Sequence, residues 1–99
     1  MIINKALADG ELTFVLEGKL DTTTSPQLQD VLLPAFDEAG HIRLDFTKVA
    51  YVSSAGLRVL LMGQKTAKAK GASMTLSGIS AEIMEIFEMT GFTGMLTIV

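Results

Sequence analysis

The sequence of 99 residues contains no cysteine and only one histidine, His41. Without cysteine, disulfide bonds and thiolate metal sites are excluded. With a single imidazole, a metal site would have to be built mainly from carboxylates, and no spacing of Asp and Glu in the sequence indicates one. We therefore expect no cofactor and no metal bound by this chain.

Basic residues are also few: Lys and Arg number 8 against 11 Asp and Glu, which gives a net charge of -3 and a pI of about 4.9. A dedicated nucleic-acid surface needs clustered Lys and Arg, so no direct nucleic-acid binding is expected. No apolar run approaches the ~20 residues of a membrane span. The first residues also lack the charged and apolar regions of a signal peptide. These absences predict a soluble, cytoplasmic protein without membrane contact.

Apolar residues, in contrast, are plentiful. The sequence is 48% hydrophobic and 19% charged, so it can build a core and is not a disordered tail. A chain of this length supports one compact domain and is too short for two. We therefore treat residues 1–99 as a single domain.

The first half predicts a hairpin followed by a helix. Asp9-Gly10 is a strong signal for a two-residue turn, and the residues after it alternate between apolar and polar as in a half-buried strand. Ser25 is expected to cap the helix, with a proline at its first position. Pro34 is expected to kink that helix or end it early, and Gly40 to stop it. The strands of the hairpin are predicted over 1–7 and 11–20.

The second half predicts alternating strands and helices. The expected elements begin with a strand over 42–46, a segment over 48–52 that leads up to Ser53 and Ser54, and a helix over 54–70 closed by Gly71. A strand over 73–76, a helix between Ser80 and Gly91 and an edge strand over 95–99 follow. The order β-β-α-β-α-β-α-β requires parallel crossovers. The expected fold class is α/β, with a mixed sheet of four to five strands and helices mainly on one face.

The stretch from Asp45 to Leu61 carries the candidate functional site, because it leads from a buried strand into an apolar helix through two adjacent serines. Placed at ~100° per residue, Ser54 projects to the side of the helix that carries Arg58, and Ser53 projects towards the packed side. A helix start offers unpaired N–H groups that suit a phosphate. A serine before a helix is also commonly only a cap, and the residues alone leave both interpretations open.

A serine hydrolase is the less favoured interpretation. A nucleophilic serine needs a base and a group that orients the base. The only histidine lies before the central strand, at the end opposite the serines, and the serines do not lie in a Gly-x-Ser-x-Gly motif.

At this stretch the sequence resembles the STAS domain, the fold of bacterial anti-sigma factor antagonists. The similarity runs from the hairpin to the last helix, and its most specific part is Asp45-Phe46-x-x-Val49-x-Tyr51-Val52-Ser53-Ser54-Ala55-Gly56-Leu57. The family's phosphorylated serine stands two places before the glycine, which identifies Ser54. Gly18-x-Leu20-Asp21 resembles a family loop that helps contact the kinase, which adds Asp21.

The sequence departs from the family pattern at two positions. Ser53 stands where the family often has Asp, and Ala55 stands where it often has Ser or Thr. The first departure leaves Ser53 as the second candidate for modification, and it removes a carboxylate that would repel a phosphate. The second removes a neighbouring hydroxyl, but neither removes the candidate hydroxyl of Ser54.

The resemblance implies partner switching and no enzymatic activity. The unphosphorylated protein would bind an anti-sigma factor with a serine-kinase fold and so free a sigma factor. The kinase would use ATP to phosphorylate Ser54, and a metal-dependent serine phosphatase would restore the binding form. ATP and metal would then belong to the partners.

A different class of STAS protein is the alternative. This is a constitutive subunit that supports an ABC transporter ATPase in lipid trafficking. Genes for a kinase and phosphatase, or for a permease and ATPase, would separate the two hypotheses.

Helical spacing adds a predicted docking strip of Arg58, Met62 and Lys65 beside Ser54. Met suits adaptable interfaces, whereas Lys65 is also compatible with plain solvation. Met84, on the outer side of the last helix, is expected to be a second contact or ordinary surface. The complete predicted partner surface consists of Asp21, Ser53, Ala55, Gly56, Arg58, Met62 and Lys65.

Overall fold

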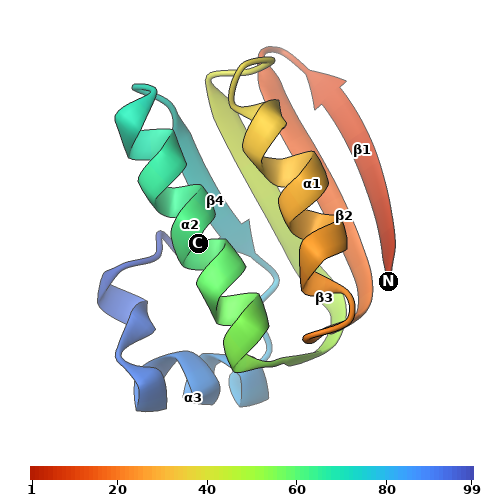
Figure 1. The fold of residues 1–99 in the computed structure, drawn as a ribbon, viewed down its shortest axis with the longest axis vertical. Coiled ribbons are helices and arrows are strands. Elements are labelled where there is room, and N and C mark those ends of the chain that lie inside the picture. The colour runs from red at the N-terminus through yellow and green to blue at the C-terminus, as the bar shows by residue number, and fades with distance from the viewer.

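A computed structural model describes residues 1–99, and its chain begins with a hairpin (Figure 1). Strands β1 (Ile2–Ala8) and β2 (Glu11–Leu20) are antiparallel and joined by Asp9 and Gly10. Both turn residues have positive φ angles, 53° and 78°, as a two-residue hairpin turn requires. The remaining elements are α1 (Ser25–Ala35), β3 (His41–Val52), α2 (Ser54–Ala69), β4 (Ser73–Ser77), α3 (Ala81–Thr90) and the short 3-10 helix η1 (Phe92–Gly94).

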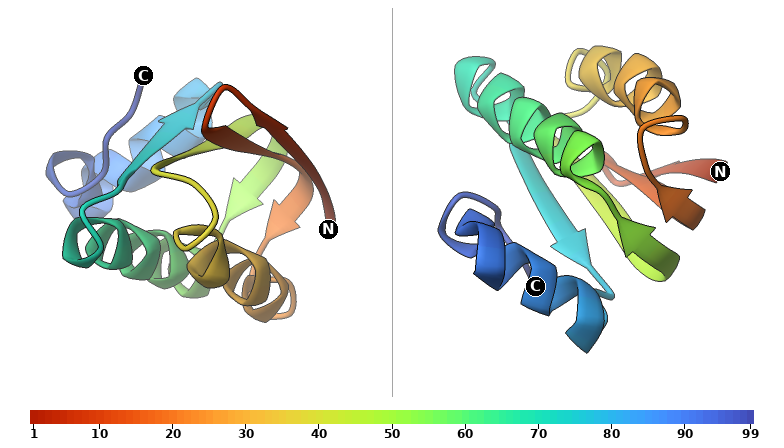
Figure 2. Two further views of the ribbon diagram at one scale, coloured as in Figure 1. Left: turned by 90° about the horizontal axis from the view of Figure 1, so that it is seen from above. Right: turned by 60° about the horizontal axis from the view of Figure 1, so that its bottom comes forward.

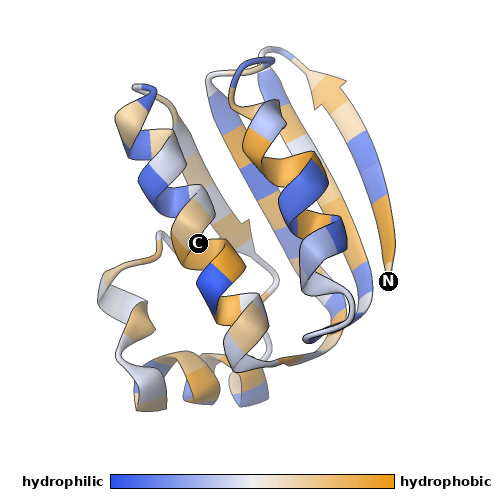
Figure 3. Ribbon diagram, viewed as in Figure 1, coloured by the Kyte–Doolittle hydropathy of each residue, from blue (hydrophilic) through white to orange (hydrophobic).

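The four strands form one sheet in the order β1-β2-β3-β4. Strand β3 pairs in parallel with both β2 and β4, so the sheet is mixed, as predicted. Hydrophobic and hydrophilic residues alternate along the inner strands (Figure 3), and paired residues such as Leu12, Ile42 and Met74 are all buried. The alternation gives the sheet one apolar and one polar face.

Helices α1 and α2 cover the apolar face side by side (Figures 1 and 2). Helix α3 lies apart from them, across the end of the sheet at which β4 finishes. The buried apolar residues form a single cluster that includes residues of α1, α2, α3 and the other three strands but no residue of β1. Strand β1 is therefore a peripheral edge of the domain.

Helix α1 begins one residue earlier than predicted and ends at the earlier of the two predicted points. Its N-cap residue is Thr24, whereas Ser25 lies inside the helix and is buried. The hydroxyl of Ser25 donates to the carbonyl oxygen of Asp21, so it anchors the preceding loop in place of capping the helix. The helix ends at Ala35, directly after Pro34, so the early end is confirmed and the predicted stop at Gly40 is wrong.

The central strand is longer than predicted. Residues 42–46 and 48–52 belong to one twelve-residue strand, β3. Its buried residues change from alternate spacing to Phe46, Val49 and Val52, and the pairing with β2 shifts register twice in this region. Such bulges let both strands continue while the buried side chains stay on one face.

The boundaries of the last two helices agree with the sequence, but the final strand does not. Gly71 follows α2 with a φ of 68°, and Gly91 ends α3 with a φ of 76°. Residues 95–99 form only an isolated bridge between Leu76 and Ile98, so the predicted edge strand is wrong. After η1, only Leu96 of this segment is buried, so little apolar burial stabilises the segment against the sheet.

Candidate functional site

The two serines lie at the junction of β3 and α2 and have different environments. Ser53 is the N-cap of α2, and its hydroxyl oxygen accepts a hydrogen bond from the backbone N–H of Gly56 at 3.3 Å. Its own backbone N–H donates to the carbonyl oxygen of Leu20 at 2.8 Å. The structure therefore gives Ser53 the capping role and fixes the junction to the end of β2.

Ser54 is the first residue of α2 and is exposed. Its hydroxyl makes no hydrogen bond within the chain. Its side chain lies at the positive end of the helix dipole, where backbone N–H groups lack helical partners. Of the two adjacent hydroxyls, that of Ser54 is thus available to another molecule, as the helical projection predicts.

Gly56 sets how closely α2 approaches the sheet. A Cβ atom at this position would lie 2.8 Å from Cγ and 2.9 Å from the carbonyl oxygen of Leu20. Both distances are shorter than van der Waals contact, and one of them is to backbone. Glycine is therefore required for the packing that places Ser54 at the end of the sheet, and Gly56 itself is buried.

Asp21 organises the loop between β2 and α1. Its carboxylate accepts hydrogen bonds from the backbone N–H groups of Thr23 at 3.0 Å and Thr24 at 3.1 Å. The bond from Thr24 is the main reason why the pKa of Asp21 lies below its usual value, and desolvation opposes the shift. The Thr24 hydroxyl in turn donates to the carbonyl oxygen of Lys19. The Asp21 side chain thus holds its own loop together.

We predict that replacing Asp21 by Ala lowers thermal stability at neutral pH. The lowered pKa means that the contribution of Asp21 is present above the usual carboxyl pKa and is lost as the pH falls through the value in the folded protein. Thermal melts from neutral to strongly acidic pH test this. The difference between wild type and the variant should shrink towards the acid end, and a difference independent of pH would contradict the assignment.

A hollow of about 240 Å³ lies between the N-terminal parts of α1 and α2. It brings together three of the predicted partner residues: Ala55, Arg58 and the half-buried Met62. The remaining lining residues come from the loop, α1 and the buried side of α2: Thr22, Ser25, Pro26, Gln29 and Val59.

The other predicted site residues lie outside this hollow: Ser53, Ser54 and Gly56 at the junction, and Asp21, Lys65 and Met84 elsewhere. Asp21 does not line it, although its neighbour Thr22 does. Lys65 is exposed further along α2, and Met84 is half-buried on α3. The contribution of α1 had no signal in the sequence, because only the packing of α1 beside α2 brings Pro26 and Gln29 to the site.

Charge is segregated between two helices. Helix α2 carries Arg58, Lys65 and Lys68 and no acidic residue, whereas the charged residues of α3 are all Glu. The chain is acidic overall, but the helix that begins at Ser54 is basic. A partner that contacts the exposed side of α2 is therefore favoured if its own surface is acidic.

The geometry argues against a serine–histidine pair. His41 begins β3 and the serines follow its last residue, so they lie at opposite ends of a twelve-residue strand. The His41 ring contacts the hydroxyls of Ser73 and Thr75 on β4. His41 therefore cannot act as a base for Ser53 or Ser54. No group of three or more His, Asp and Glu side chains is arranged to hold a metal ion.

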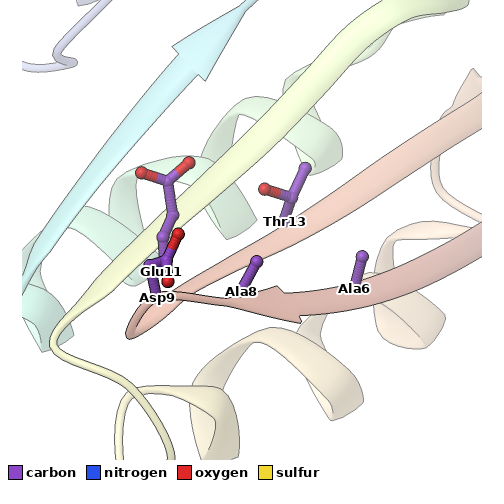
Figure 4. A pocket seen from close by; sticks show the side chains of 5 residues that line it. All are labelled: Ala6, Ala8, Asp9, Glu11 and Thr13. Carbon is purple, nitrogen blue, oxygen red and sulfur yellow. The ribbon is translucent and has the colours of Figure 1, made fainter.

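A second hollow, of about 340 Å³, lies on the polar face of the sheet near the hairpin turn (Figure 4). It is lined by Ala6, Ala8, Asp9, Glu11 and Thr13. None of these is a predicted site residue, and Glu11 pairs with His41 at the start of β3, the end opposite the serines.

None of the helices is both long and apolar enough to span a bilayer.

Comparison with protein families decides the classification. The family model described as "Mlab, STAS domain" matches residues 3–98. The chain belongs to the STAS domain family. Among curated relatives of this STAS domain is the putative anti-sigma factor antagonist BtrV of Bordetella bronchiseptica, 32% identical over 85 residues, which cover 85% of this chain and 73% of BtrV. The anti-sigma-B factor antagonist of Bacillus subtilis is 26% identical over 90 residues, covering 91% of this chain and 83% of that protein.

Solved structures show the same fold. A putative anti-sigma factor antagonist from Thermotoga maritima superposes with a TM-score of 0.85 at 16% identity, over 97% of this STAS domain and 84% of that chain. Unphosphorylated SpoIIAA, an anti-sigma factor antagonist, gives a TM-score of 0.77 at 15% identity, over 99% and 87%. At these identities the likeness establishes the fold, and the predicted α/β class is confirmed.

Proposed function

We propose that this STAS domain is an anti-sigma factor antagonist controlled by phosphorylation of Ser54. The observation that carries the proposal is the difference between the two serines: Ser53 is engaged as the helix cap, and Ser54 is exposed with a free hydroxyl. The names of the curated relatives support the regulatory class. A phosphorylated form of SpoIIAA is also among the structural neighbours, with a TM-score of 0.75 at 18% identity.

The unphosphorylated protein binds an anti-sigma factor that is itself a serine kinase. The contact surface contains Ser54, the Asp21 loop and the hollow beside Arg58 and Met62. Lys65 extends this surface along α2. The junction of β3 and α2 contributes Ser53, Ala55 and Gly56. Since α2 is basic, the complementary surface of the partner is acidic.

The switch is a change of charge at one end of α2. The Ser54 oxygen takes the γ-phosphoryl group of ATP held by the kinase, its proton is released, and ADP leaves. The phosphate adds roughly -1.5 to -2 charge and is stabilised locally by the helix start. It also opposes an acidic partner, so the complex weakens while the domain stays folded.

The reverse step belongs to a metal-dependent serine phosphatase, which hydrolyses the phosphoserine to serine and inorganic phosphate. Both nucleotide and metal are bound by the partners in this scheme. The STAS domain is a ligand and a substrate, it acts in the cytoplasm, and it catalyses neither step.

Mass spectrometry after incubation with the cognate kinase and ATP tests the proposal. Wild type is expected to gain one phosphate, and Ser54→Ala is expected to gain none. Ser53→Asn is the matched control, because Asn removes the hydroxyl but retains a good helix cap. It should be phosphorylated as wild type is.

Two outcomes would overturn the assignment. If Ser54→Ala is still phosphorylated and Ser53→Asn is not, the modified residue is Ser53. If wild type takes up no phosphate from any kinase encoded beside it, the result favours the alternative, a constitutive subunit that supports an ABC transporter ATPase. Copurification with such an ATPase would establish that alternative.

A further inference from the structure

Strand β1 is an edge of the sheet with no further strand paired to its outer side. It pairs only with β2. At the opposite edge, β4, the backbone N–H of Leu76 donates to the carbonyl oxygen of Thr97, and the N–H of Val99 donates to the carbonyl oxygen of Leu76. Seven residues long and without proline, β1 is exposed along most of its length, including Ile2 and Leu7. An edge of this kind is a template for pairing with another strand.

The hairpin determines which backbone groups of β1 are free. In a hairpin with a two-residue turn, the residues that flank the turn, here Ala8 and Glu11, exchange hydrogen bonds, and the pattern alternates from there. The backbone N–H and C=O groups of Ile3, Lys5 and Leu7 therefore point away from β2. These three residues are spaced symmetrically about Lys5.

The side chains of the same three residues lie on the helix-covered face, because they stand opposite the buried residues of β2: Leu16, Phe14 and Leu12. There they border a hollow of about 370 Å³ between β1 and α1, lined by Ile3, Lys5, Phe14, Gln27, Asp30, Val31, Pro34 and Glu38. Leu7 lies on this face beyond the hollow and is 63% exposed. Each copy of the chain thus has both an exposed apolar side chain and a partly apolar recess along one strand.

We propose that two copies of this chain associate through β1, in antiparallel register about a two-fold axis at Lys5, to form a continuous eight-stranded sheet. In this register the outward groups of Lys5 pair with those of the second copy's Lys5. Ile3 of the first copy stands opposite Leu7 of the second copy. The Leu7 side chain then lies at the entrance to the first copy's hollow between β1 and α1.

The edge is self-complementary, which favours a second copy as the occupant: the exposed Leu7 of one copy meets the recess beside Ile3 of the other. The two Lys5 side chains face each other at the axis, where like charges repel, and the ion pair of each Lys5 with its own Glu38, at 3.0 Å, offsets part of that repulsion. The apolar pair of Ile3 and Leu7 occurs twice, once on each side of the axis, as a two-fold interface requires. A strand pair of this size buries less than a standard interface of ~1,600 Å², so association depends on concentration.

Sedimentation equilibrium from micromolar to millimolar concentration tests the proposal. Wild type is expected to form a dimer, and Leu7→Lys to raise the dimer dissociation constant about tenfold or more. Met89→Lys is the matched control, because Met89 is 80% exposed on α3 and lies outside the proposed interface. A monomer at all concentrations would overturn the proposal and would favour pairing of β1 with an extended segment of another protein. A dimer unaffected by Leu7→Lys would overturn it too.

The absence of cysteine allows a test of register. Lys5→Cys places two thiols opposite each other at the axis, within the 4.4–6.8 Å Cα separation of disulfides, and should oxidise to a covalent dimer. Asn4→Cys is on the same strand but on the other face and off the axis, and should not. Equal cross-linking of both variants would contradict the register. Phosphorylation of Ser54 should be unchanged in Leu7→Lys, so failure of this proposal is distinguishable from failure of the switch.

Discussion

Gly56→Val is expected to lower the free energy of unfolding by about 3 kcal/mol, at the upper end of the usual cost of overpacking. The first side-chain carbon alone would lie 2.9 Å from the Leu20 carbonyl oxygen, and valine adds two methyl groups. Relief of this steric overlap would require α2 to move away from β2. That movement would break the hydrogen bond from Ser53 to Leu20. Urea unfolding followed by circular dichroism measures the change.

Gly40→Val is the matched control for this prediction. A Cβ atom added at Gly40 would have no other atom within 4 Å, and the φ angle of Gly40 is not positive, so its substitution should leave stability nearly unchanged. Gly56→Ala should fall between the two, because the intrinsic helix preference of Ala over Gly, about 1 kcal/mol, offsets part of the clash. Equal stability of Gly56→Val and Gly40→Val would show that the contact with Leu20 is unimportant.

The parts of the fold that were predictable depend on local chemistry. Asp9 and Gly10 adopt the positive φ angles that their turn requires, and Ser80 caps α3 by accepting from the backbone N–H of Ile83. Both features need only a few consecutive residues. The separation of Ser53 from Ser54 is of the same kind, because one residue of helix rotates a side chain by ~100°.

The parts that were missed depend on contacts between distant segments. Ser25 satisfies the rules for a cap, yet its hydroxyl bonds to the loop at Asp21 and Thr24 takes the cap position. Residues 95–99 are apolar enough for a strand, but η1 leaves them only one bridge to Leu76. The hollow beside Ser54 is likewise formed by two helices whose packing no local pattern encodes.

Ser54→Asp is expected to weaken binding to the anti-sigma partner at least about tenfold, since like charges brought together in an interface cost several kcal/mol. The same substitution should slightly raise stability, by about 0.5 kcal/mol, because an acidic side chain is favourable at a helix start. Isothermal titration calorimetry and urea unfolding on the same samples measure both quantities. Opposite signs for affinity and stability would separate a charge switch from general damage.

Ser54→Asn is the neutral control, because Asn has nearly the size and shape of Asp but carries no charge. Its affinity should stay close to that of wild type. Salt provides the second control: the penalty of Ser54→Asp should shrink as ionic strength rises, since exposed charges are screened over ~10 Å at 0.1 M. Two results would argue against a charge-based switch: an undiminished affinity of Ser54→Asp, or an equal loss of affinity in Ser54→Asn. In the second case the partner would instead recognise the shape and hydroxyl of Ser54, and phosphate would act by steric exclusion.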